Sequence, residues 1–231
     1  MTIHFENELA GLKEKLLTMA SHAESAVAKA IKALVERDDE LARRVMADDV
    51  IVDQLEIEID ELSIQLLSKA PLATDLRLIT MTMKISNHLE RVSDEATTIA
   101  RRSLELSMEP QLKPYVDIPR MAAMALDMLK EALDSFVNRN PEKARAIVPR
   151  DKEVDLLNKQ LHRELSSYMV ERPSTITRCL NLMVISKSLE RIADHAANVA
   201  EEVVYLYEAR DIRHSGKMAP AAPAAPVTAP A

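Results

Sequence analysis

Glycine and aromatic residues are scarce in this chain of 231 residues, with glycine occurring twice and aromatic side chains making up 3%. β-Strands and tight hairpin turns are enriched in these residue types, so their scarcity argues against a β-rich fold. A glycine-rich loop that could cradle phosphate is also excluded from the folded part. The single cysteine, Cys179, cannot form an intrachain disulfide, and its apolar surroundings predict a buried, inert thiol.

Long apolar runs and an excess of positive charge are missing as well. No stretch reaches the roughly 18 uncharged apolar residues that a membrane-spanning helix needs, and the first residues lack the apolar core of a signal peptide. The net charge is −7 and no basic stripe is visible, so nucleic acid is not an expected partner. We therefore expect a cytoplasmic protein that does not span the membrane.

The abundant residues are Ala, Leu, Met, Glu, Lys and Arg, which favour helices and predict an all-α fold. Prolines punctuate the helical patterns, and Asn140 followed by Pro141 is typical of a helix start. The second and fifth helices are candidates for a break near their starts, the fifth at Pro149. The expected helices cover residues 4–36, 40–69, 73–108, 119–138, 142–171 and 175–209.

The segment LERVSDEATTIA, which begins at Leu89, returns as LERIADHAANVA, which begins at Leu189. Matches at a similar offset extend along both halves, which indicates an internal duplication. Short connections make neighbouring helices antiparallel, so each half should be a three-helix bundle. We expect tandem bundles over 1–110 and 111–214, followed by a disordered Ala/Pro-rich tail over 215–231.

Each repeat carries two pairs of acidic residues four positions apart, which places each pair on one helix face. Both pairs of a repeat are equidistant from the hairpin turn, at Pro71 or Pro173, so their four carboxylates should lie at one level. Such like charges need neutralising, and all-oxygen ligands suit hard cations such as Mg, Ca, Mn or Fe. The candidate metal ligands are Asp49, Asp53, Glu90 and Asp94 in the first repeat, and Asp151, Asp155, Glu190 and Asp194 in the second.

Other interpretations of the acids remain open. The clusters could point into solvent, or pair with Arg91 and Arg191, which would either support the ligands or form surface ion pairs. Acids near the middle of long helices gain nothing from a helix N-terminus. His195 is better explained as a capped or exposed histidine than as a ligand. No Glu-x-x-His motif of a di-iron enzyme is present and no nucleophile–base arrangement stands out, so we do not expect an enzyme.

The two repeated segments, together with HFENELAGLKEKLLTMA and ERDDELARRV, resemble the PhoU family of phosphate-uptake regulators over about residues 3 to 210. The resemblance implies two tandem three-helix bundles whose Glu/Asp-x-x-x-Asp motifs, here the eight candidate ligands, bind multinuclear clusters of Fe, Mn, Mg or Zn. This chain has Ser93 and Ala193 where the family often has glycine. Glu95 of the first repeat corresponds to His195 of the second. The two repeats are therefore not expected to bind metal identically.

The resemblance also implies a function. It predicts a negative regulator of phosphate uptake and of the phosphate-starvation response, acting as an adaptor between the ATPase of a phosphate ABC transporter and a sensor histidine kinase, and forming a homodimer. The alternatives are a metal-dependent helical-bundle enzyme or metal store, and a plain helical scaffold.

Overall fold

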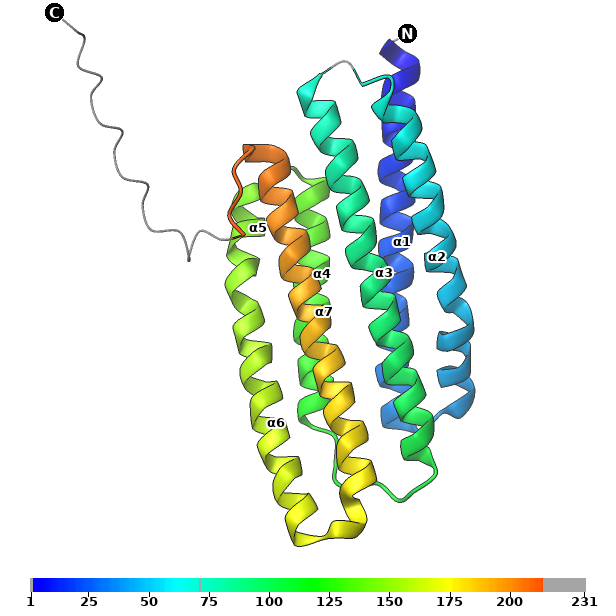
Figure 1. The fold of residues 1–231 in the computed structure, drawn as a ribbon, viewed down its shortest axis with the longest axis vertical. Coiled ribbons are helices and arrows are strands. Elements are labelled where there is room, and N and C mark those ends of the chain that lie inside the picture. The colour runs from blue at the N-terminus through cyan, green and yellow to red at the C-terminus, as the bar shows by residue number, and fades with distance from the viewer. Residues whose placement is uncertain (1, 71, 214–231) are drawn as a thin grey trace, which may run out of the picture.

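The computed structural model describes residues 2–70 and 72–213, and every regular element in those ranges is a helix (Figure 1). The predicted all-α fold is therefore confirmed. Pro71 and the expected tail over 215–231 lie outside the described residues. The elements are α1 (Thr2–Glu36), α2 (Asp39–Leu67), α3 (Ala73–Ser107), α4 (Asp117–Val137), α5 (Pro141–Ile147), the 3₁₀ turn η1 (Val148–Arg150), α6 (Asp151–Glu171), the 3₁₀ turn η2 (Pro173–Thr175) and α7 (Ile176–Glu208).

The predicted break in the fifth helix is confirmed, because η1 contains Pro149 and separates α5 from α6. Proline has no backbone N–H and clashes with the preceding turn, so a continuous α-helix cannot pass through it undisturbed. The break suggested near the start of the second helix is wrong. α2 runs without interruption because it contains no proline or glycine and starts at a good cap.

The duplication extends to the loops between the first two helices of each repeat. Arg37 and Arg139 both adopt the left-handed backbone conformation, with φ of 59° and 53°. The next residues, Asp38 and Asn140, cap α2 and α5, and each side chain accepts a 2.9 Å hydrogen bond from the backbone N–H three residues on. The Asn140 cap with Pro141 in the first turn is as predicted.

The helices pack side by side, with α2 and α6 at the two outer edges (Figure 1). α3 packs against α1 and α2, α7 packs against α4 and α6, and α3 packs against α7. The inner faces carry the core, in which Leu89 of α3 and Leu189 of α7 are fully buried. None of the described helices is long and apolar enough to cross a membrane.

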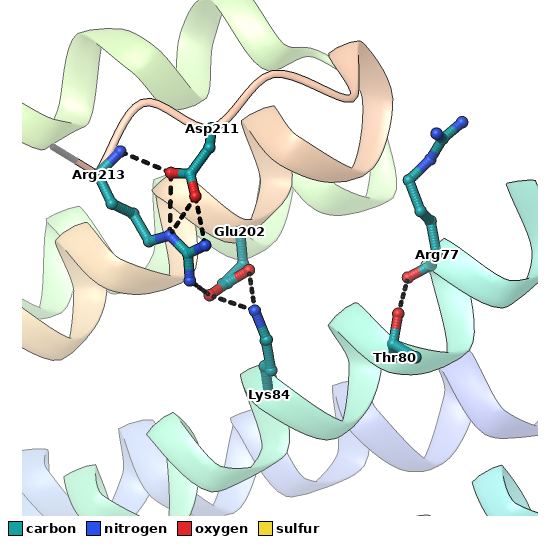
Figure 2. A network of polar contacts seen from close by, with 6 residues as sticks. All are labelled: Arg77, Thr80, Lys84, Glu202, Asp211 and Arg213. Atoms are coloured by element: carbon teal, nitrogen blue, oxygen red, sulfur yellow. Dashed lines mark hydrogen bonds and ion pairs between the residues drawn. The ribbon is translucent and has the colours of Figure 1, made fainter. Parts of the chain in front are cut away.

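A polar network fastens the segment that follows α7 to the α3–α7 interface (Figure 2). The carboxylate of Glu202 on α7 is almost fully buried, and it accepts hydrogen bonds from Lys84 of α3 at 3.3 Å and from Arg213 at 3.4 Å. The carboxylate of Asp211 accepts hydrogen bonds from the same guanidinium group. Ala209 ends α7 in the left-handed conformation, which turns the chain so that Arg213 reaches Glu202.

Candidate metal centres

The first carboxylate cluster lies on the seam between α2 and α3. Asp49 and Asp53 project from α2, and Ser93 of α3 donates a 2.5 Å hydrogen bond to Oδ1 of Asp49. Burial raises the pKa of Asp53, and the nearby charges of Asp49 and Asp94 raise it further. Asp94 on α3 thus lies close enough to Asp53 of α2 to repel it, so the seam brings acids of the two helices together.

Glu90 is the most perturbed member of this cluster. Burial raises its pKa to about 7, and repulsion from Asp94, Glu56 and Asp53 adds to this effect. Its Oε2 atom is buried and accepts no hydrogen bond from the described residues, although Nε of Arg91 lies 3.3 Å away. This carboxylate is the kind of underused oxygen that a cation would satisfy.

The second cluster lies on the seam between α6 and α7. Burial raises the pKa of Asp151, the backbone N–H of Lys152 opposes that shift, and the charges of Asp155 and Asp194 reinforce it. In the described part of the chain, Oδ1 of Asp151 has no hydrogen-bond donor. Asp151 is therefore close enough to Asp155 and Asp194 to be repelled by both.

The placement of Asp151 corrects one expectation. The sequence predicts that Asp151 lies inside a long helix, but α6 begins at this residue because η1 interrupts the helix at Pro149. Asp151 therefore lies in the first turn of α6, where the helix dipole favours a negative charge. Its counterpart Asp49 lies in the interior of α2 and receives no such help.

The two arginines beside the clusters behave differently. Arg91 forms ion pairs within its own helix, at 3.3 Å from both Glu90 and Asp94. Arg191 instead crosses the α3–α7 interface to Glu95, with Nη1 3.0 Å from Oε1. Arg91 therefore pairs with acids of the first cluster, as one of the alternative interpretations expected. Within the described residues, Arg191 does not pair with the second cluster and instead links the two repeats.

His195 is neither capped nor exposed, which corrects that expectation. It is half-buried between α7 and α3, and its Nδ1 lies 3.2 Å from Nδ1 of His88. Burial lowers the pKa of His88 to about 4, helped by the charges of His195 and Lys84. Sequence patterns gave no signal for this pair, because the contact depends on how the two repeats face each other. Cys179, by contrast, is buried as predicted.

Sequence reasoning also missed a buried polar group in the second repeat. Oγ of Ser186 on α7 donates a 2.7 Å hydrogen bond to Oδ1 of Asn158 on α6 and lies 3.1 Å from Nε2 of His162. These contacts fix the register of α6 against α7 near the second cluster. A small polar residue at a core position of the repeated helix was the available signal.

The carboxylates fit a hard cation chemically but are not arranged as a finished site. Among the described residues, no three His, Cys, Asp or Glu side chains stand ready to hold an ion. The donors are all oxygens, however, and Oε2 of Glu90 and Oδ1 of Asp151 lack hydrogen-bond donors within the described chain. Coordination of an ion would therefore require the carboxylate side chains to change conformation.

Comparison with known proteins identifies the family. The sequence model of the PhoU domain matches residues 16–103 and 118–203, so it matches the chain twice. The chain belongs to the PhoU family. A phosphate-specific transport system accessory protein PhoU homolog from Pseudomonas aeruginosa is 39% identical over 92% of this chain and 88% of that protein. Homolog 2 from Thermotoga maritima is 38% identical over 85% of this chain and 84% of that protein.

Solved PhoU structures share the fold. The crystal structure of PhoU from Pseudomonas aeruginosa has a TM-score of 0.86 and 38% identity, and the match covers 89% of this chain and all of that one. The crystal structure of the phosphate transport system regulatory protein PhoU from Streptococcus pneumoniae has a TM-score of 0.85 at 29% identity, over 90% of this chain and 99% of that one. The predicted family and fold are thus confirmed.

Proposed function

We propose that this PhoU-family chain restrains phosphate uptake and keeps the phosphate-starvation response off when phosphate is plentiful. The observation that carries this proposal is the near full-length match to proteins named as accessory or regulatory components of phosphate transport. Those names describe a transport component and not a catalyst. The chain would act in the cytoplasm as a homodimeric adaptor between the transporter's ATPase and a sensor histidine kinase.

We further propose that each repeat, over 1–110 and 111–214, contributes one metal centre. Asp49, Asp53, Glu90 and Asp94 would hold a hard cation in the first repeat. Raised pKa values at Asp53 and Glu90 support this role, because a cation would remove the repulsion that causes part of each shift. The matching acids of the second repeat, Asp151, Asp155, Glu190 and Asp194, would do the same. Fe, Mn, Mg and Zn are the ions to test.

The regulatory role can be tested by alkaline phosphatase output at high phosphate. A strain without the gene should show high output, and the wild-type gene should silence it. Unchanged output on deletion would contradict the proposed regulation.

The metal role needs a variant with Asp49→Asn, Asp53→Asn, Glu90→Gln and Asp94→Asn. The purified variant should bind fewer ions by elemental analysis and should fail to silence alkaline phosphatase. Glu14→Gln, which removes an exposed carboxylate of α1 outside the cluster, is the matched control. Normal silencing by a variant that has lost its metal would separate regulation from the metal.

A further inference from the structure

The outward face of α2 carries an apolar line that no other described element covers. Val50, Ile57 and Ile64 are 63%, 52% and 63% exposed. They are seven residues apart, so they form a stripe about 21 Å long on one side of the helix. α2 packs against α1 and α3 through its opposite face. These three residues are called the α2 stripe.

Negative charge surrounds the α2 stripe. From Val45 to Leu67 the helix contains no lysine or arginine. The same stretch contains seven carboxylates, at Asp48, Asp49, Asp53, Glu56, Glu58, Asp60 and Glu61. By helical geometry, Asp53 and Asp60 flank the stripe on the side of α3, and Glu61 lies on the side of α1. Lys15 of α1 pairs with Glu58 at 2.5 Å. Glu61 is exposed and Asp60 is partly exposed.

The second repeat shows that the fold does not require this stripe. The residues that correspond to Val50, Ile57 and Ile64 in α6 are Lys152, Lys159 and Ser166. α6 nevertheless forms the same outer helix at the opposite edge of the bundle (Figure 1). A line of exposed apolar residues that packing does not demand is typical of an interaction surface.

We propose that the α2 stripe docks a basic amphipathic helix of a protein partner. Apolar residues of that helix, spaced over two turns, would cover Val50, Ile57 and Ile64, and its Lys or Arg residues would lie over Asp60 and Glu61. The acidic flanks disfavour an anionic membrane or nucleic acid, and they would repel the α2 helix of a second copy. The proposal rests on the proposed function in expecting that an adaptor works by protein contact.

The chain itself supplies one competing occupant. On α6, the basic residues Lys152, Lys159 and Arg163 share a face with Leu156, which is 64% exposed. A second copy could therefore present α6 to the α2 stripe. Because α2 and α6 lie at opposite edges, that contact would be head-to-tail and would tend to form open chains. Self-association is thus an outcome that the experiment must distinguish.

The test uses the full chain and a synthetic helical peptide of about 18 residues, with leucines at two-turn spacing and lysines on both flanks. The test variant is Val50→Lys, Ile57→Lys, Ile64→Ser, which gives α2 the residues that α6 carries at these positions, so we expect it to fold. Fluorescence anisotropy should show that the variant binds the peptide about thirtyfold more weakly or worse. Binding to the wild type should also weaken with salt.

Matched controls locate the effect on α2. Leu156→Lys with Val170→Lys changes exposed apolar residues of α6, and peptide affinity should stay at the wild-type value. A peptide of the same composition with its leucines dispersed should bind weakly. Equal binding of the dispersed peptide, or equal binding by the α2 variant, would overturn the proposal. Self-association of the wild type that either the α2 variant or the α6 variant abolishes would assign the stripe to a second copy and likewise overturn it.

Alkaline phosphatase output separates this proposal from the proposed function. If the wild-type gene silences alkaline phosphatase output but the purified chain does not bind the peptide, the docking proposal fails and the regulatory role stands. If deletion of the gene leaves output unchanged, the regulatory role fails, whatever the peptide result. Loss of silencing in the α2 variant, with its helix content intact by circular dichroism, would support both.

Discussion

The two carboxylate clusters hold equivalent positions in the repeats but differ in how their charge is balanced. In the second repeat, Lys159 lies 3.6 Å from Asp155 and Lys187 pairs with Glu190. In the first repeat, Arg91 alone pairs with both Glu90 and Asp94. The duplication thus kept the acids in place while the cations around them diverged.

The helix break widens this difference. Asp151 lies at the start of α6, where the helix dipole stabilises its carboxylate, whereas Asp49 lies inside α2. Glu56 also adds repulsion to Glu90, and its counterpart in the second repeat is the neutral Asn158. On the proposed metal role, the first cluster would therefore gain more stability from a cation than the second.

If the two repeats differ in charge alone, their hydrophobic cores should be equally stable. The largest expected loss of stability tests this. Leu89→Ala and Leu189→Ala each remove a fully buried side chain from the α3–α7 layer. Each should lower the free energy of unfolding by about 3 kcal/mol, as deletion of a buried leucine usually does. Urea denaturation measures both losses. Clearly unequal values would mean that packing, as well as charge, differs between the repeats.

Metal addition should separate the clusters directly. Protein saturated with Mn²⁺ or Mg²⁺ should gain about 2 to 3 kcal/mol for each occupied centre over the metal-free form, at a hundredfold excess over the dissociation constant. Asp49→Asn with Asp53→Asn should remove more of this gain than Asp151→Asn with Asp155→Asn. Thermal unfolding with and without metal measures the gain. If both double variants lose the same part of the stability gained from metal, the ion pairs around each cluster do not determine how strongly metal stabilises it.

His88 gives a pH-dependent test at the junction of the repeats. Its pKa is about 4 in the folded protein against a usual 6.5, so the unfolded chain takes up the proton first as the pH falls. Stability should fall between pH 6.5 and 4, by about 2 kcal/mol at pH 5. His88→Gln in metal-free protein should lack this loss. His22→Gln, at an exposed histidine of α1, is the control and should leave the pH profile of the wild type unchanged.

The sequence was sufficient for features that depend on local pattern or on helix register. The proline positions predicted the break at Pro149, and equidistance from the turn predicted that Asp53 of α2 would lie beside Glu90 of α3. Features of the α3–α7 interface could not be predicted, because the contacts of His195 with His88 and of Arg191 with Glu95 depend on how the repeats face each other. The helix dipole acts on Asp151 because the break at Pro149 creates a new helix start at this residue. A pattern of helix-forming residues alone does not reveal that start.

The smallest expected effect isolates the charge of a single carboxylate, that of Glu90. The pKa of Glu90 is about 7 in the folded protein against a usual 4.5, so the unfolded chain releases its proton first as the pH rises. Ionisation of Glu90 should therefore lower stability between pH 4.5 and 7 in the metal-free protein. Glu90→Gln cannot ionise, so its stability relative to the wild type should rise across that window and level off above it.

Glu190→Gln is the matched change in the second repeat. It removes an ion pair with Lys187, which should cost no more than about 0.5 kcal/mol at neutral pH for a partly exposed pair. Urea unfolding of metal-free protein from pH 4 to 8 measures both variants. At pH 8 the free energy of unfolding should rise in Glu90→Gln and fall slightly in Glu190→Gln. This result would locate the uncompensated charge in the first repeat. A destabilising Glu90→Gln would show that its pair with Arg91 outweighs the cost of burying its charge.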